Sequence, residues 1–164
     1  MSPPNLSPAK QLAAFLARYD PVIAAKARAA IAYLRKRLPN ATGLVYDNYN
    51  ALAIGFGPSE RASEAILSLA IYPRWINLFF LQGASLPDPQ RILRGSGTRV
   101  RHIVLNDAKE MRLPAVEALI SIALATAKKP LDAKAKRSLV IKSIAAKQRP
   151  RRPRDKQATG RRRI

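Results

Sequence analysis

The first part of the chain carries apolar residues at helical spacing. Between residues 8 and 19 four large apolar side chains fall on one face of a helix. Asp20 then offers an N-cap and Pro21 a first helical position, so a second helix is predicted to run to about Leu38. Its apolar positions repeat with a period of 3.6 residues, and its basic residues face water. Pro39 ends it.

The middle of the chain changes to short segments rich in β-branched and aromatic residues, separated by turn residues such as asparagine, glycine and proline. This pattern predicts an antiparallel meander. The predicted strands cover residues 44–48, 51–56, 65–72, 75–81 and 99–105. Residues 83–97, which contain two prolines and three glycines, are expected to form an irregular connection before the fifth strand.

The last third mixes both patterns. Asn106 or Asp107 can start a short helical turn, and residues 113–128 read as a helix that Pro130 closes. The apolar core of residues 138–144 favours a sixth strand, at a sheet edge because lysine guards such edges. The flanking alanines and lysines leave a short helix as the alternative.

Together these elements predict an α+β fold. A sheet of five or six mostly antiparallel strands would carry the N- and C-terminal helices on one face. The chain has 164 residues, of which 48% are hydrophobic, so one domain with a real core is expected. We assign residues 1–147 to this domain. Residues 148–164 are almost free of apolar side chains and are predicted to be a disordered basic tail.

The formal net charge of +20 is unevenly distributed. Residues 1–127 carry a net +7 and residues 128–164 a net +13. This asymmetry predicts a polyanionic partner, nucleic acid first and an anionic membrane surface second. Without aromatic residues the tail should bind nucleic acid independently of sequence, although it could also serve only for solubility. The predicted phosphate-binding residues are Arg149, Arg151, Arg152, Arg154, Lys156, Arg161, Arg162 and Arg163.

Four stretches of the sequence together resemble one known family. YDNYNALAIGFGPSERASEA, YPRWINLFFLQGASLPDP, LRGSGTRVRHIVL and LVIKSIAAKQRPRR resemble the YdhG-like family, a domain of unknown function. The resemblance covers roughly residues 10–152. It implies an antiparallel sheet with helices on one side, and it implies that KQRPRR belongs to the family pattern. It implies no reaction, although parts of the wider superfamily carry a frataxin-like iron-chaperone label.

Aromatic and polar residues gather on the predicted strands. One sheet face should pack on the helices, and the other would form a concave ligand site, with ordinary core packing as the alternative. We expect Tyr46, Trp75 and Arg99 to share one concavity. An acid in a strand, as Asp47 is, should lie at a wet rim or pair with a cation such as Arg101. The full set is Tyr46, Asp47, Asn48, Tyr49, Asn50, Tyr72, Trp75, Asn77 and Phe80.

The glycine-rich stretch from Arg94 to Arg99 could point successive N–H groups at an anion, with a plain turn as the alternative. It does not match a phosphate-binding P-loop, because it lacks GxxxxGK[ST] and a strand follows it. The predicted ligand-binding residues are Tyr46, Asp47, Tyr49, Tyr72, Trp75, Arg94, Ser96, Arg99 and His102.

His102 is the only histidine, and cysteine is absent. This composition predicts no disulfide, no transition-metal site and no cofactor, and it suits a reducing cytoplasm, where we expect the protein. No run of residues is apolar enough to span a membrane, and the N-terminus lacks the pattern of a secretory signal. The oligomeric state is not predicted.

The sequence therefore predicts a non-catalytic module that binds a small anionic molecule, with a basic tail that binds nucleic acid. The first alternative is an enzyme that uses the same pocket, with His102 or Asp47 as the acid–base group. The second is iron chaperoning, which ten acidic residues against thirty basic ones disfavour electrostatically.

Overall fold

A computed structural model describes residues 6–153 of the chain. Two helices come first, α1 (Pro8–Ala17) and α2 (Pro21–Arg37). Helix α2 begins as the sequence predicts, because the Asp20 carboxylate accepts a hydrogen bond from the Val22 N–H. Helix α1 has a cap that was not predicted, in which the Ser7 hydroxyl accepts a hydrogen bond from the Lys10 N–H. A proline follows each cap. Because α1 ends at Ala17 and α2 begins at Pro21, a short turn joins the two helices.

The sheet has six strands in the order β5-β4-β3-β2-β1-β6. Its first five strands form the predicted antiparallel meander. Strand β6 lies beside β1 and runs parallel to it, so the sheet is mixed. The strands are β1 (Thr42–Asp47), β2 (Leu52–Gly57), β3 (Leu67–Ile71), β4 (Ile76–Phe80), β5 (Arg101–Leu105) and β6 (Ser138–Ile144).

The α+β fold is confirmed, and residues 138–144 form an edge strand rather than the alternative helix. Three short 3-10 helices lie in the connections: η1 (Ala62–Glu64), η2 (Gly83–Ser85) and η3 (Ala108–Arg112). The last of these is the helical turn predicted after Asn106, and the Asp107 side chain caps it. Helix α3 (Pro114–Ala125) ends three residues before its predicted end.

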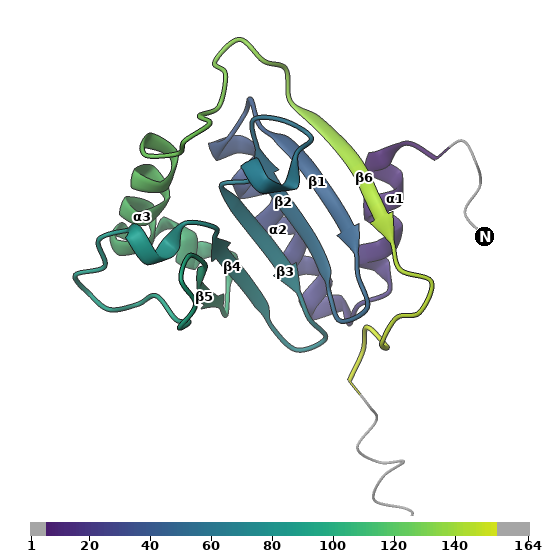
Figure 1. Ribbon diagram of the computed structural model, residues 1–164. Helices are drawn as coiled ribbons and strands as arrows, with labels where there is room; N and C mark the ends of the chain where they lie inside the picture. Colours follow the sequence, from purple (N-terminus) through teal and green to yellow (C-terminus); the bar gives the residue numbers. More distant parts are fainter. Residues whose placement is uncertain (1–5, 154–164) are drawn as a thin grey trace, which may run out of the picture.

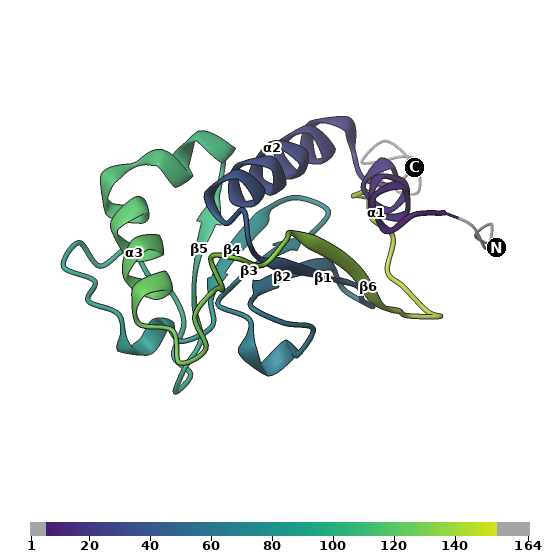
Figure 2. The ribbon, with the colours of Figure 1, turned by 90° about the horizontal axis from the view of Figure 1, so that it is seen from above.

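The two faces of the sheet differ (Figures 1 and 2). Helices α1 and α2 cover one face, which we call the helix face, and α3 lies at the β4–β5 side. Alternate strand residues from Val45 to Leu105 bury their side chains there with the apolar residues of all three helices. We call the opposite side the open face, because within residues 6–153 no helix of the three covers it. Only the connection that carries η1 crosses one end of it.

In the part of the chain that the structure describes, no helix has the length and apolar character needed to cross a bilayer.

Candidate functional site

Asp47, at the end of β1, is buried on the helix face, with 1% of its side chain exposed. Its Oδ1 accepts a hydrogen bond from Arg151 Nη2 at 2.9 Å, and its Oδ2 accepts bonds from Gln148 Nε2 at 2.9 Å and Arg18 Nη1 at 3.2 Å. We call these four residues the Asp47 cluster. Of the two environments predicted for Asp47, the structure has the cation pair, but Arg101 is not the partner.

The same cluster corrects the predicted boundary of the tail. Residues 148–153 are placed against β1: the Arg149 N–H donates to the Tyr49 carbonyl at 2.9 Å, and Gln148 Nε2 also bonds the Asp47 carbonyl at 3.0 Å. The Arg151 guanidinium bonds the carbonyls of Tyr49 and Asn48 and is as buried as Asp47. A low count of apolar residues predicted disorder here, but hydrogen bonds and charge pairing hold the segment instead.

Arg151 is therefore misassigned as a phosphate-binding residue, because its guanidinium is buried and already bonds Asp47 and two backbone carbonyls. Arg149 and Arg152 remain exposed. Arg149 lies over the ring of Tyr49, with its guanidinium carbon 5.6 Å from the ring centroid. The other predicted tail contacts, from Arg154 to Arg163, lie outside the described residues.

Tyr19 joins the Asp47 cluster to the middle of the sheet. It lies between α1 and α2 and is fully buried. Its hydroxyl donates to the Ile71 carbonyl at 2.6 Å and accepts from the Leu52 N–H at 3.1 Å, and Arg151 lies over its ring. Burial raises the pKa of Tyr19, and the positive charge of Arg151 opposes that rise. The hydroxyl therefore serves as a neutral bridge between β2 and β3.

The open face carries much of the predicted aromatic and polar set. Strand register places Tyr46, Ala53, Ala70 and Asn77 in one row across β1 to β4. The next row contains Leu44, Gly55, Ser68, Phe79 and His102. Asp47 and Phe80 belong to the opposite face, so the predicted set is divided between the two sides of the sheet. Tyr49 and its two asparagine neighbours lie exposed in the β1–β2 turn.

Two aromatic pairs stand on this face or at its margin. Tyr72 and Trp75, in the β3–β4 turn, stack with ring centroids 4.9 Å apart, and 44% of Trp75 is exposed. Phe79 and His102 face each other across β4 and β5 at 5.3 Å. Between the pairs, Asn77 is 8% exposed. Its Oδ1 and the hydroxyl of Tyr46 are buried without a hydrogen-bond partner among the described residues, a rare condition in folded proteins.

The stretch from Arg94 to Arg99 is not an anion cradle in this structure. Arg94 pairs with His102 as an isolated bridge, and residues 95–100 form an exposed loop in which Gly95 has a φ of +118°. The loop turns carbonyls inward: Arg101 Nη1 donates to the Gly97 and Val100 carbonyls at 2.6 and 2.8 Å. Ser96 and Arg99 are exposed on the loop. Tyr46, Trp75 and Arg99 do not line the pocket described below.

His102 and Asp47 do not converge. They lie on opposite faces of the sheet, on strands separated by three others. Burial, with a further contribution from the charge of Arg94, lowers the pKa of His102, so it is neutral at pH 7. An acid–base pair made of these two residues is therefore ruled out by geometry.

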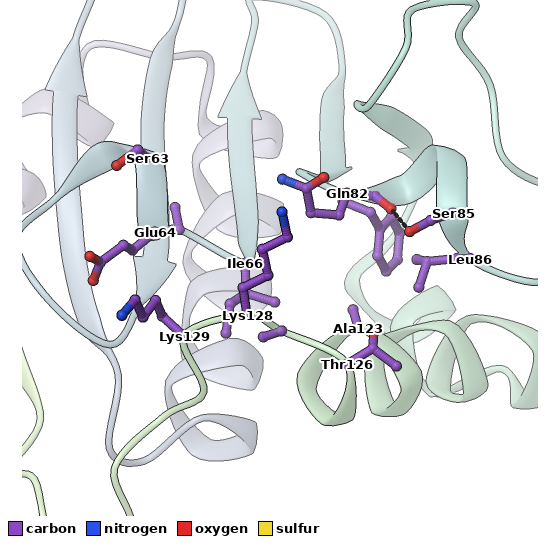
Figure 3. A pocket seen from close by; sticks show the side chains of 13 residues that line it. Ser63, Glu64, Ile66, Gln82, Ser85, Leu86, Ala123, Thr126, Lys128 and Lys129 are labelled. Carbon is purple, nitrogen blue, oxygen red and sulfur yellow. Dashed lines mark hydrogen bonds between the residues drawn. The ribbon is translucent and has the colours of Figure 1, made fainter.

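A pocket of about 400 Å³ opens at the end of the sheet where β3 begins and β4 ends (Figure 3). Its floor is apolar and includes Ile66, Phe80, Leu86 and Ala123. Its rim is polar. The rim residues are Ser63, Glu64, Gln82, Ser85, Thr126, Lys128 and Lys129. We call it the lysine pocket.

Two glycines allow the walls of this pocket to approach the sheet. A Cβ on Gly83 would lie 2.5 Å from the Cβ of Arg101, and one on Gly57 would lie 2.9 Å from the backbone of Ala65. Contacts this close exclude a side chain. Glycine at these two positions therefore lets η2 and the segment after η1 stand on the strands as opposite walls.

The charge at the rim is predominantly positive. Lys128 and Lys129 follow the C-terminus of α3, and neither forms an ion pair with a described residue. In Figure 3 the Lys128 side chain extends past Ile66 toward Gln82, and the Lys129 ammonium points toward Glu64. The Glu64 carboxylate accepts a hydrogen bond from the Ser59 hydroxyl at 2.7 Å. The rim thus offers two ammonium groups against one carboxylate.

Sequence reasoning missed the lysine pocket because its lining comes from three distant stretches of chain. In the sequence, Lys128 and Lys129 indicate the end of a helix, and Ser63 and Ser85 indicate loops. The available signal was the pair of glycines, Gly57 at the end of β2 and Gly83 at the start of η2. Such glycines indicate a close backbone approach but do not tell what it encloses.

Within residues 6–153 no group of three or more histidine, aspartate and glutamate side chains comes together as a metal site would require. Comparisons of the chain with protein-family models, curated proteins and solved structures found no match in any of the three. Membership of the YdhG-like family therefore stays a prediction from the quoted motifs.

Proposed function

We propose that this protein is a non-catalytic binding module for a small amphipathic anion, and that the lysine pocket is its site. The observation that carries this proposal is an apolar floor beneath two unpaired ammonium groups in a cavity of about 400 Å³. That volume and mix of apolar lining with few polar groups is typical of small-molecule sites. Neither His102 nor Asp47 lines the pocket.

The floor and the rim select for different parts of a ligand. Ile66, Phe80 and Leu86 favour a hydrocarbon or aromatic body, because covering them removes apolar surface from water. Lys128 and Lys129 favour a carboxylate, sulfonate or phosphate at one end. Gln82 and the Ser85 hydroxyl add hydrogen-bonding groups, although that hydroxyl already donates to the Gln82 carbonyl at 2.9 Å.

The test uses 8-anilinonaphthalene-1-sulfonate, an aromatic anion that fluoresces when sheltered, and N-phenyl-1-naphthylamine, its uncharged analogue. Replacing both Lys128 and Lys129 by alanine should weaken binding of the anion roughly two- to thirty-fold, as for two exposed charge contacts, and leave the neutral probe unaffected. The matched control is Lys134→Ala with Lys136→Ala, outside the pocket. Ser85→Phe, which fills the rim, should reduce binding of both probes.

Equal probe binding by the wild-type protein and Ser85→Phe would refute the pocket as the site. Loss of both probes in the lysine double variant would show that its effect is not electrostatic. Far-UV circular dichroism of each variant separates lost binding from lost folding.

Nucleic-acid binding is the second candidate function, favoured by the surface charge. Residues 6–153 hold 25 Lys and Arg against nine Asp and Glu, and only Asp47 and Glu117 form ion pairs within them. Most cations are thus free to contact phosphates, beyond those of residues 154–164. Affinity for duplex DNA that falls with rising salt would support this function, and no binding at low salt would refute it.

A further inference from the structure

Within residues 6–153 no helix covers the open face of the sheet. Its centre consists of small side chains, with Ala53, Gly55, Ser68 and Ala70 on β2 and β3. Larger aromatic side chains stand around them on β1, β4 and the β3–β4 turn. A face that only needed solubility would carry charged residues on these central strands, yet none of these positions does.

We propose that this face binds single-stranded nucleic acid, with unpaired bases stacked on its aromatic side chains. The inference rests on the second candidate function and names its substrate class and its site. Stacking is available at two places, at Trp75 in the turn before β4 and at Phe79 on β4. They are four residues apart, or about 13 Å at a rise of roughly 3.3 Å per residue. Every base has a flat apolar face, so aromatic platforms of this kind bind single strands with little sequence preference.

Asn77 lies between the two platforms, and Tyr46 belongs to the same row of residues three strands away, on β1. Asn77 Oδ1 and the Tyr46 hydroxyl have no partner among the described residues and are not used by the fold. Buried polar atoms are nearly always paired, by protein or by something bound to it. The edge of an unpaired base supplies both donors and acceptors, whereas in a duplex those edges are already paired. The preference for a single strand follows.

Cations border the face. Arg74 is exposed in the same turn as Trp75, and Arg94 is exposed beside His102 on the β5 side. On the other margin Lys142 lies at the irregularity of β6 and is exposed. Glu64 in η1 and Glu60 just before it bring negative charge to the η1 end of the face. A backbone that crosses the sheet would meet positive charge on both sides.

A second copy of the chain is the competing occupant of an unpartnered sheet face. The formal net charge of +20 opposes it, because two copies brought face to face repel each other. The same charge attracts a polyanion. Charge therefore decides between the two occupants in favour of nucleic acid.

Trp75 is the only tryptophan of the chain, so its fluorescence reports on this face alone. The experiment titrates the full-length protein with a twelve-residue oligothymidylate, a duplex of equal length, and inorganic polyphosphate, which has charge but no bases. We expect the single strand to quench Trp75 and polyphosphate to leave it unchanged. By anisotropy of labelled oligonucleotides, the single strand should bind more tightly than the duplex.

Substitutions on the face should weaken binding without altering its charge dependence. Trp75→Ala and Phe79→Ala should each reduce single-strand affinity about 5- to 150-fold, the range for loss of one base stack, with an unchanged salt slope. Trp75→Phe should retain most of the affinity. The matched control is Val22→Ala, which shortens an exposed apolar side chain on α2.

The outcomes distinguish failure of this inference from failure of nucleic-acid binding as a function. If the oligothymidylate binds without quenching Trp75, and both alanine variants bind as the wild type does, the open face is not the site, while nucleic-acid binding itself stands. If nothing binds at low salt, both fail. A dimer that Trp75→Ala dissociates in sedimentation would assign the face to a second copy and overturn the inference.

Discussion

Asp47 shows how one side chain can fasten a distant part of the chain. Its carboxylate receives hydrogen bonds from α1 through Arg18 and from the C-terminal segment through Gln148 and Arg151. A buried carboxylate is costly unless paired, and here two of its three partners, Gln148 and Arg151, lie 101 and 104 positions away in sequence. The stretch QRPR thus has a structural role that its composition alone conceals.

Asp47→Ala should destabilise the fold by about 3–5 kcal/mol, because it leaves the Arg151 guanidinium buried without its carboxylate. The double variant Asp47→Leu with Arg151→Met should cost less than the sum of the two single variants, since it removes both charges together. Urea unfolding followed by circular dichroism measures these differences. Arg152→Ala, at an exposed neighbour, is the control and should change little. A single-variant effect no larger than that control would contradict the buried pair.

His102 allows a clean measurement because no other histidine overlaps its signals. Its ring proton in NMR should titrate with a midpoint below 6.5, and Arg94→Ala should raise that midpoint, because burial and then the charge of Arg94 lower the pKa. The neutral form is favoured by folding, so the associated stability is present above pH 6.5 and is lost as the pH falls through the folded-state pKa. A midpoint at 6.5 in both proteins would refute this environment.

At the scale of elements, β6 and the segment after it act together. Strand β6 lies beside β1 and runs parallel to it. Directly after β6, the Ala145 N–H donates a hydrogen bond to the Asp47 carbonyl, at the end of β1, at 2.8 Å. The bond from Arg149 to the Tyr49 carbonyl continues this contact along the β1–β2 turn. The domain therefore extends to at least Pro153, and a cut at Lys147 falls inside it.

A chain that ends at Lys147 should be less stable than one that ends at Pro153 by about 3–5 kcal/mol, because it loses Arg151 and leaves Asp47 with fewer partners. The midpoint of urea unfolding for each chain gives the comparison, with the full chain as reference. The chain that ends at Pro153 should match the full chain. Equal midpoints for all three would show that the segment adds no stability.

At the scale of the whole molecule, charge dominates. The open face, the lysine pocket and the C-terminal cations all lie on a body with a large excess of positive residues. Long-range attraction of this kind raises association rates with any polyanion and makes its binding depend on salt. Removing the cations of one region at a time measures how much that region contributes to polyanion binding.

Removing residues 154–164 removes five Lys and Arg and one Asp. If about four of these cations contact duplex DNA, the slope of log affinity against log salt should become shallower by roughly 3–4 units in the chain that ends at Pro153. Fluorescence anisotropy across a salt series measures both slopes. Using the cut at Pro153 keeps the Asp47 cluster intact, so a change in binding reflects charge rather than unfolding. An unchanged slope would assign the binding to the folded body.

The sequence by itself determined the elements and their order along the chain. The helical period located α1 and α2 to within a few residues, and the cap at Asp20 marked the start of α2. Turn residues divided the meander correctly. Such signals act between near neighbours. The edge position of β6 was also predicted, from its lysine. Local chemistry was sufficient for these features.

Only the tertiary structure decided which side chains meet. A shift of one residue along a strand changes the face, so Tyr46 and Asp47, adjacent in sequence, serve the open face and the helix face. The buried position of Arg151 depends on the Asp47 carboxylate, 104 residues away. The lysine pocket depends on three stretches that are distant in sequence. Contacts between side chains so far apart in sequence depend on how the sheet assembles, so the composition of a short stretch cannot predict them.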